Sequence, residues 1–282
     1  MKLGGDEVQD VTTTHGGLTL DGVLNIADRG RLSDGVVLLT HGTFAHNRMR
    51  LMTDLQHLLG ARGITTLAIT LSLGVDQRRG MYDCARPHRH RHTDSLDEIG
   101  AWLEWLRDAG ADNIVLLGHS RGGNQTAWFA AERLSGADDI KAVVLVAPMT
   151  WSQTRAHEFY QQHHGLDIRP VIERAKSLGG DEMLTGVPFL FCPETTAAAG
   201  SYLSYHGDEP RLDTPTLMSA IPRPLLVVAA ENDEIMDDLP ERTEAVKRAD
   251  LELVMVPDAD HFFKGPFAEQ AADAITGFLD EL

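Results

Sequence analysis

The chain has 282 residues, of which 43% are hydrophobic, enough for the core of one large domain or of a domain with an inserted cap. The formal net charge of −17 makes nucleic acid and anionic membrane poor partners. No apolar stretch is long enough to cross a bilayer, and the first ten residues lack the basic cluster and apolar run of a signal peptide. We therefore expect neither a membrane partner nor a signal peptide.

The cysteine content indicates in which cellular compartment the protein is expected. Cys84 and Cys192 are the only cysteines in the sequence. Two cysteines make no disulfide framework of the kind that stabilises small secreted domains. This content is typical of a protein in a reducing cytoplasm, which is the location that we expect.

The first part of the chain predicts an alternation of strands and helices. Residues 7–27 alternate, with turns at Gly16-Gly17 and Asp21-Gly22, which indicates antiparallel strands at the edge of a sheet. Residues 36–40 form a continuous apolar run, as expected for a strand buried on both faces. The elements predicted next are a helix with Met52, Leu55 and Leu59 on one face, a strand at 64–71, a long loop at 72–92, a helix with Leu96, Ile99, Leu103 and Leu106 on one face, and a strand at 113–117.

The helix after the long loop has alternative N-terminal caps. Ser95 and Glu98 have the spacing of a capping box, in which the two residues satisfy each other's backbone N–H groups. Thr93 and Asp94 are the alternative capping residues. The sequence does not choose between these caps.

Residues 118–122 read Gly-His-Ser-Arg-Gly and match the pattern G-x-S-x-G. They follow the strand at 113–117 and precede a helical pattern at 124–134, the strand–turn–helix context in which this pattern exposes a nucleophilic serine. Side chains beside Ser120 would collide with the backbone in so tight a turn, and the flanking glycines avoid this collision. We therefore expect Ser120 at the carboxyl end of a strand, above the positive N-terminus of a helix.

Residues 150–220 interrupt the alternation. They are rich in His, Gly and Pro and contain short helical pieces, such as 169–178, but no clear strand period. The alternation resumes with a strand at 224–230, a helix at about 237–248, a strand at 251–256 and a last helix at 266–282. Strands that alternate with helices predict a mostly parallel sheet with helices on both faces.

Two residues downstream of the serine are candidates for its catalytic partners. A serine hydroxyl needs a general base, and the base needs an acidic residue to orient it. Loops after parallel strands converge at one edge of the sheet, so both partners should directly follow strands. His261 follows the last predicted strand and Asp233 follows the strand before it, whereas Glu231 and Glu234 compete with Asp233 for the acidic role.

The chain order Ser120, Asp233, His261 resembles that of the α/β-hydrolase-fold serine hydrolases, a family with esterases and lipases among its members. The resemblance implies an α/β fold with a mostly parallel eight-stranded sheet, helices on both faces and a small helical cap. It divides the chain into a core at 1–149 and 221–282 and a cap at 150–220.

The resemblance also implies residue roles. Ser120 corresponds to the nucleophile, His261 to the general base and then acid, and Asp233 to the residue that fixes the imidazole tautomer. A serine in place of an aspartate at this turn argues against the haloalkane dehalogenases and epoxide hydrolases of the superfamily. No cofactor is implied.

A further implication concerns the oxyanion. Its backbone N–H donors correspond to Arg121, the residue after the nucleophile, and to Thr43, the residue after a His-Gly pair. Phe44, His119 and Trp151 are candidate substrate-binding residues, although packing also explains His119.

The loop at 72–92 carries positive charge on an acidic chain, and its last part reads Arg-Pro-His-Arg-His-Arg-His. In an extended segment the histidines and the arginines point to opposite sides. Three interpretations are open: a metal site with Cys84, recognition of an anionic substrate by the loop, and a solvated loop whose arginines pair with surface acids. The residues in question are Arg78, Arg79, Arg86, Arg89, Arg91, His88, His90 and His92.

These observations predict a serine hydrolase that cleaves a small-molecule carboxylic ester, which could be anionic, through an acyl-serine intermediate. Aromatic side chains in residues 150–220 could form a lid over an apolar pocket, or could simply pack the cap onto the core. A thioesterase or amidase with the same triad is the first alternative. A non-catalytic ligand-binding or interaction protein on the same fold is the alternative of another class.

Overall fold

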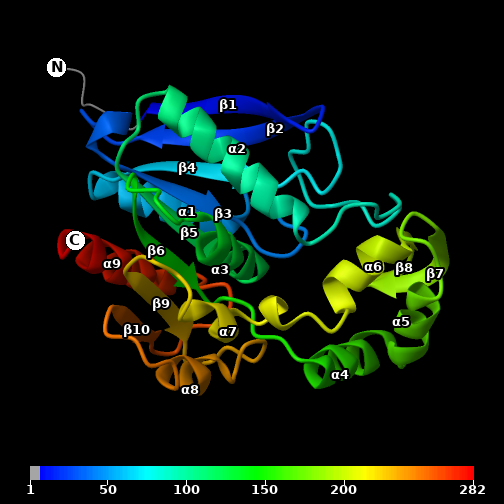
Figure 1. The fold of residues 1–282 in the computed structure, drawn as a ribbon. Coiled ribbons are helices and arrows are strands. Elements are labelled where there is room, and N and C mark those ends of the chain that lie inside the picture. The colour runs from blue at the N-terminus through cyan, green and yellow to red at the C-terminus, as the bar shows by residue number, and fades with distance from the viewer. Residues whose placement is uncertain (1–6) are drawn as a thin grey trace.

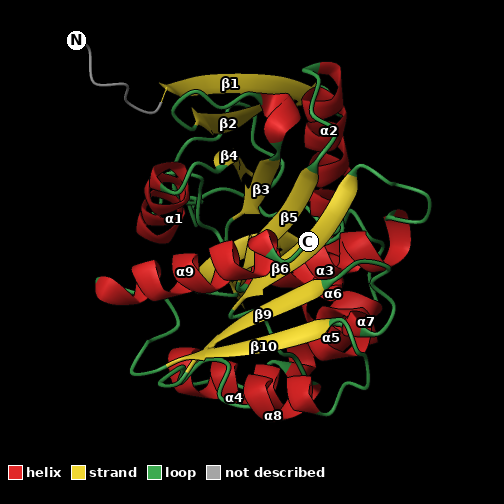
Figure 2. Cartoon of the chain, turned by 90° about the vertical axis from the view of Figure 1, so that its left-hand side faces the viewer, coloured by secondary structure: helices red, strands yellow, loops and turns green. Residues whose placement is uncertain are grey.

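The computed structural model describes residues 7–282, and its central feature is a twisted eight-stranded sheet (Figure 1). Figure 2 shows the strands following one another across the sheet in the order β1-β2-β4-β3-β5-β6-β9-β10. The first two strands are antiparallel to their neighbours, and the other neighbouring pairs are parallel. The strands are β1 (Glu7–His15), β2 (Leu18–Ile26), β3 (Val36–Thr40), β4 (Thr65–Thr70), β5 (Ile114–His119), β6 (Ile140–Val146), β9 (Leu225–Ala230) and β10 (Leu251–Val256). The predicted mostly parallel eight-stranded α/β sheet is therefore confirmed.

Helices cover both faces of this sheet. One face packs against α1 (Arg50–Ala61) and α9 (Pro266–Asp280). The other face packs against α2 (Asp94–Asp108), α3 (Arg121–Arg133), α7 (Thr214–Met218) and α8 (Leu239–Glu244), and a short 3-10 helix, η1 (Leu32–Asp34), precedes β3. Alternate residues of β9 illustrate the layering: Leu225 and Val227 belong to one apolar cluster, whereas Leu226 belongs to the other. Strands buried on both faces explain the continuous apolar runs in the sequence.

Some predicted boundaries are wrong. The hairpin does turn at Gly16-Gly17, where both glycines have positive φ, but the turn expected at Asp21-Gly22 lies inside β2. Gly22 is required there for packing, because a Cβ at this position would come within 2.7 Å of the Trp102 ring. The helix expected at 237–248 is shorter and spans only α8.

The inserted segment contains a small sheet that its sequence did not predict. Its elements are α4 (Gln153–His164), α5 (Arg169–Lys176), β7 (Met183–Phe189), β8 (Cys192–Ala198), α6 (Ala199–His206) and η2 (Pro210–Leu212), followed by α7. The antiparallel pair β7–β8 has two register irregularities, so its side chains do not alternate regularly. The expected purely helical cap is thus corrected to a mixed one, most of which lies on the right of Figure 1.

The insertion forms its own apolar cluster. Phe189, Tyr202 and Tyr205 are fully buried in it, and the cluster also takes in Phe44 and Tyr82 from two core loops. Leu212, Leu217 and Met218, at the end of the predicted cap range, pack instead in the core cluster beside α3.

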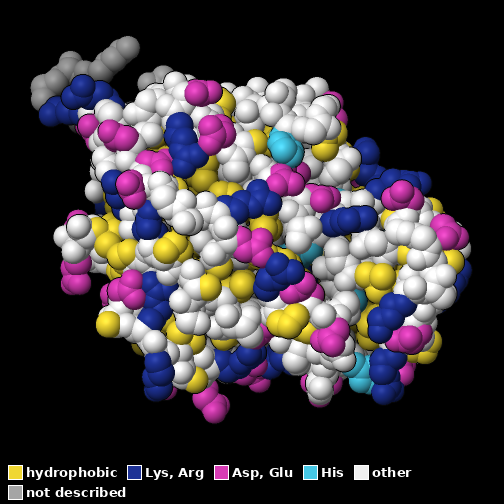
Figure 3. Space-filling model, in the orientation of Figure 1, with side chains coloured by type: hydrophobic (Ala, Val, Ile, Leu, Met, Phe, Trp, Pro, Cys, Tyr) yellow, Lys and Arg dark blue, Asp and Glu magenta, His cyan; other side chains and the backbone are white. Residues whose placement is uncertain are grey.

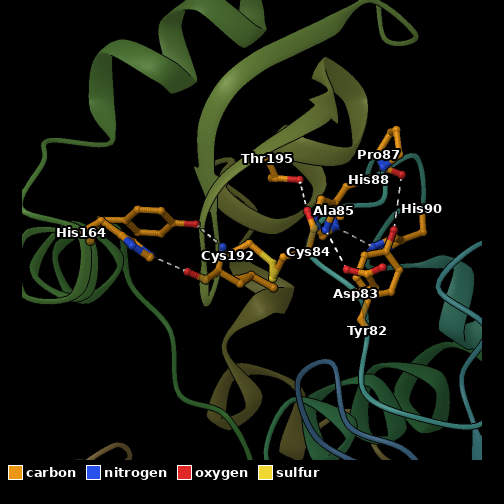
Figure 4. The surroundings of a disulfide bond; sticks show 12 residues. Tyr82, Asp83, Cys84, Ala85, Pro87, His88, His90, His164, Cys192 and Thr195 are labelled. Carbon is orange, nitrogen blue, oxygen red and sulfur yellow. Dashed lines mark hydrogen bonds between the residues drawn. A yellow bond between two sulfur atoms is a disulfide. The ribbon is translucent and has the colours of Figure 1, made fainter.

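A disulfide bond joins Cys84 in the long loop to Cys192 at the start of β8, with 5.5 Å between the two Cα atoms (Figure 4). The backbone of the loop also pairs with β8, because His88 N–H donates to Thr196 O and Ala198 N–H donates to His88 O, both at 2.8 Å. The two cysteines thus form a bond although they make no disulfide framework, and cysteine content no longer argues for a reducing compartment. The bond also excludes a Cys84 thiolate as a metal ligand.

The predicted alternation in the loop is confirmed. His88, His90 and His92 are buried, whereas Arg89 and Arg91 are exposed. His88 stacks on Phe189 with 4.3 Å between ring centroids, so the histidine side of the loop packs into the insertion. Among residues 7–282, no cluster of three or more His, Cys, Asp or Glu side chains is placed to hold a metal ion.

On the face shown in Figure 3, Lys and Arg side chains are interspersed with Asp and Glu. No helix between residues 7 and 282 has the length and apolar character needed to cross a membrane.

Glu98 does not form a capping box with Ser95, which is one of the alternatives that the sequence leaves open. Thr93 is the N-cap residue of α2, and the buried Glu98 carboxyl group instead accepts hydrogen bonds from the backbone N–H and hydroxyl groups of Ser72. Burial raises the pKa of Glu98 to about 7, although both Ser72 hydrogen bonds act in the opposite direction. The start of the long loop is thus attached to α2 by a carboxyl group that is readily protonated.

This raised pKa predicts a pH-dependent stability. The folded protein holds a proton that the unfolded chain releases above the ordinary pKa of 4.5, so stability should fall as pH rises from about 4.5 to 7. Glu98→Gln removes this dependence, and the variant should gain stability relative to wild type by about 1.4 kcal/mol per pH unit across that window. Urea unfolding of both proteins at several pH values measures the difference, and a constant difference would contradict the assignment.

Candidate active site

The turn between β5 and α3 places Ser120 in a strained backbone conformation. Ser120 has φ 55° and ψ −123°, in a region that side-chain-bearing residues rarely adopt. A Cβ at Gly118 would overlap the carbonyl group of Gly122, and a Cβ at Gly122 would overlap the carbonyl group of His41. The helix starts directly after Ser120, three residues earlier than the sequence pattern suggested. Only glycine at the two flanking positions permits this close approach.

The structure brings together the three residues predicted to act in concert. Ser120 Oγ lies 2.9 Å from His261 Nε2, and His261 Nδ1 lies 2.7 Å from Asp233 Oδ2. All three side chains are buried and lie in loops or turns at the carboxyl ends of β5, β9 and β10. With Nδ1–H donating to the carboxylate, Nε2 is free to accept the serine proton.

Asp233 is held by more than the histidine. Its Oδ1 accepts hydrogen bonds from the backbone N–H groups of Ile235 and Met236, both at 2.9 Å. Burial would raise the pKa of Asp233, but the hydrogen bond and charge of His261 together with the two N–H groups hold it below its ordinary value. The competing Glu231 and Glu234 are exposed, and Glu231 accepts a hydrogen bond from Asp258 N–H. The geometry therefore favours Asp233 as the partner of the histidine.

His119 lies directly against His261. Its Nε2 donates to His261 O at 2.9 Å, and the two rings lie 5.0 Å apart. Burial lowers the pKa of His119 to about 3, so the ring is neutral. The structure thus places His119 against the His261 backbone, which agrees with packing better than with substrate binding.

The two expected oxyanion residues are also adjacent. Arg121 Nε donates to Thr43 Oγ1 at 3.0 Å, so a side-chain contact ties the loop after β3 to the residue after Ser120. His41 fixes the same loop, because its Nδ1 donates to Gly42 O at 2.8 Å and its Nε2 accepts from Leu71 N–H at 3.0 Å. The backbone N–H groups of Thr43 and Arg121 thus lie on two segments that adjoin each other beside Ser120.

A small pocket opens beside these residues. Its volume of about 10 Å³ has room for little more than one water-sized molecule. Phe44, a candidate substrate-binding residue, lines it, whereas Trp151 lies outside and packs against the core cluster. Leu190 and Tyr205 of the insertion also line the pocket, although the sequence did not indicate them as site residues. Tertiary folding brings them next to the loop after β3. The lining residues are His41, Gly42, Thr43, Phe44, Leu71, Leu73, Arg121, Gln125, Leu190 and Tyr205.

Residues 36–276 match the alpha/beta hydrolase family, and the chain belongs to that family. No match is found among curated protein sequences.

Solved structures of other proteins share the fold at low sequence identity. Est1E from Butyrivibrio proteoclasticus is 18% identical with a TM-score of 0.68, over 96% of this chain and 98% of that one. The same protein with bound ferulic acid gives a TM-score of 0.70 over the same shares of both chains. The Pyrococcus furiosus esterase Pf2001 is 19% identical with a TM-score of 0.63, over 98% and 91%. These likenesses establish the fold.

The close approach at Gly122 predicts a stability cost. Gly122→Ala should destabilise the protein by about 1–3 kcal/mol, because the obstacle to the new methyl group is rigid backbone. Gly277→Ala is the matched control: this exposed glycine lies in α9 with no atom within 4 Å of the added Cβ, so stability should rise by about 0.5–1 kcal/mol. Chemical denaturation measures both, and a Gly122→Ala variant as stable as wild type would contradict the packing described.

Proposed function

We propose that the protein is a serine hydrolase that cleaves carboxylic esters through an acyl-serine intermediate. The observation that carries the proposal is the chain of hydrogen bonds from Ser120 through His261 to Asp233 at the carboxyl edge of the sheet. A buried serine within 2.9 Å of an imidazole that is itself oriented by a carboxylate has the arrangement needed to activate a weak nucleophile. Membership of the alpha/beta hydrolase family and the fold of known esterases support the same reaction class.

The proposed reaction has two halves. Ser120 Oγ attacks the ester carbonyl carbon while His261 Nε2 takes the serine proton, and the resulting oxyanion binds the N–H groups of Thr43 and Arg121. His261 then gives the proton to the leaving alcohol, and the C–O bond breaks to leave the acyl-serine. A water molecule, deprotonated by His261, attacks the acyl group, and the acid departs as Ser120 regains its proton. Asp233 stabilises the imidazolium that forms in each half.

The alternatives differ in the leaving group or in the absence of chemistry. A thioesterase or amidase would use the same residues. The ester interpretation is favoured because one similar solved structure is named an esterase and another, Est1E, holds ferulic acid. A non-catalytic binding protein would have no need for a strained serine aligned with a buried histidine and aspartate.

Chromogenic acyl esters of graded chain length test the proposal. Wild type should turn over at least one of them, and Ser120→Ala should lower kcat by about 10⁶ because the nucleophile is lost. A serine-directed phosphonate should label Ser120 in wild type and leave the variant unlabelled, as mass spectrometry would show. Absence of both turnover and labelling would refute the proposed ester hydrolase.

The acidic residue can be tested against its neighbours. Asp233→Asn should lower kcat by about 10⁴, because an amide no longer fixes the imidazole tautomer or stabilises its charged form. Glu231→Gln and Glu234→Gln are matched controls, since both side chains are exposed and lie within two residues of Asp233; they should retain nearly full activity. A large loss in either control with an active Asp233→Asn would reassign the acidic role.

A further inference from the structure

Two arginines lie near the proposed oxyanion site, Arg78 buried and Arg121 partly buried, and their environments differ. Arg78 is only 6% exposed, yet its guanidinium is well satisfied. It donates to Leu71 O at 2.7 Å, to Gly80 O at 2.6 Å and to Ala45 O at 2.7 Å. These contacts use all three of its nitrogens to hold the long loop, so Arg78 has little capacity left for a ligand.

Arg121 is the arginine with donors to spare. Its Nε donates to Thr43 Oγ1, but Nη1 is buried and no described residue accepts a hydrogen bond from it. Within residues 7–282 no carboxylate forms an ion pair with this guanidinium, although the chain has 42 Asp and Glu residues. Its Cζ lies 5.2 Å from the centroid of the Tyr205 ring, which supplies only a cation–π contact.

The surroundings of Arg121 supply no counter-charge. Burial lowers the pKa of His90 and of His92, with the charge of Arg121 contributing, and both rings are neutral. Burial raises the pKa of the Tyr205 hydroxyl, which therefore stays protonated. Burial also lowers the pKa of Arg121, but a guanidinium remains charged in proteins. A positive charge thus lies in a mostly apolar pocket without a negative partner.

We infer that the ester substrate carries a carboxylate, separate from the scissile ester, which the Arg121 guanidinium binds. This inference rests on the proposed ester hydrolysis, because Arg121 follows the proposed nucleophile and contacts the second oxyanion residue. The guanidinium is partly buried, and its buried Nη1 donor without an acceptor is costly. A carboxylate on the ligand offsets that cost with charge-assisted hydrogen bonds. One free guanidinium matches the single charge of a carboxylate better than the near-double charge of a phosphate.

Because Arg121 lines the pocket, its guanidinium discriminates between charged and neutral substrates. The pocket that it lines has Leu71, Leu73, Phe44 and Leu190 as apolar walls, together with polar residues such as Gln125 and Thr43. Apolar walls of this kind strengthen the interaction of a charge with a bound carboxylate. Because the pocket has a volume of only about 10 Å³, a ligand must displace lining side chains to reach the guanidinium. A neutral ester would leave the buried Nη1 unpaired in the bound state, and this penalty discriminates against it.

The test compares charged esters with neutral analogues of the same shape. On the acyl side, aryl esters of glutarate and adipate are compared with the methyl ketones in which an acetyl group replaces the carboxylate. On the alcohol side, 4-acetoxybenzoate is compared with 4-acetoxyacetophenone. In wild type, kcat/KM should favour the charged member of at least one pair by about 10- to 100-fold, the range expected for hydrogen bonds to charged groups.

Variants assign the preference to Arg121. Arg121→Gln should abolish the charged-to-neutral ratio, whereas Arg89→Gln, the same change at an exposed arginine of the long loop, should preserve it. Thr43→Val removes the acceptor of Arg121 Nε and should also preserve most of the ratio. If Arg121 only holds the oxyanion loop, Arg121→Gln will lower both members of a pair equally, and that result would overturn the inference.

The remaining outcomes separate this inference from the proposed function. Labelling of Ser120 and turnover of neutral esters without any preference for charged ones overturns the inference alone. A preference that Arg89→Gln removes and Arg121→Gln preserves also overturns it. If Arg121→Gln does not fold, competitive inhibition of wild type by 5-oxohexanoate is compared with inhibition by 2,6-heptanedione, in which a second acetyl group replaces the carboxylate. Equal inhibition by the charged and the neutral ketone refutes the inference. No labelling and no turnover of any ester overturns both proposals.

Discussion

The backbone at the start of α3 lies so close to the end of β3 that no side chain fits between them. Gly122 meets the carbonyl groups of Thr40 and His41, and this contact fixes the loop after β3 relative to the turn that carries Ser120. The N–H groups expected to face an oxyanion lie on these two segments. Their relative position therefore depends on backbone packing rather than on mobile side chains, and His41 and the Arg121–Thr43 hydrogen bond reinforce it. The strain at Ser120 persists because the surrounding sheet overdetermines the turn.

Elements whose signal is local could be predicted from the sequence. The sheet could be predicted from the apolar runs of β3, β5 and β9, and the turn from the G-x-S-x-G pattern. The geometry of parallel sheets indicated Asp233 and His261, because each follows the end of a strand. The insertion could not be predicted in this way, because β7 and β8 have an irregular register and are stabilised by contacts with a loop about a hundred residues earlier. For the same reason, nothing near Leu190 or Tyr205 in the sequence indicated that they line the pocket.

The histidines and the arginines of the long loop have two different roles. His88 stays neutral and stacks on Phe189 of the insertion, while Arg89 and Arg91 face outward. Figure 4 shows His88 and His90 beside Tyr82 of the same loop, near the disulfide. The conspicuous basic run is therefore largely a packing element with a charged outer side. The arginine with spare hydrogen-bond donors is Arg121, for which the sequence indicated a role of the backbone N–H group only.

The bond between Cys84 and Cys192 has a topological consequence. It closes a covalent ring that contains β5, Ser120, α3 and β6, while Asp233 and His261 lie on the open tail that follows. A single break in the chain anywhere inside the ring would leave every part of the protein covalently connected. A break between Cys192 and the start of β9 would instead release the tail that carries the acid and the base. That tail would then be held only by noncovalent packing, including that of β9, β10, α8 and α9 in the sheet and its helical layers.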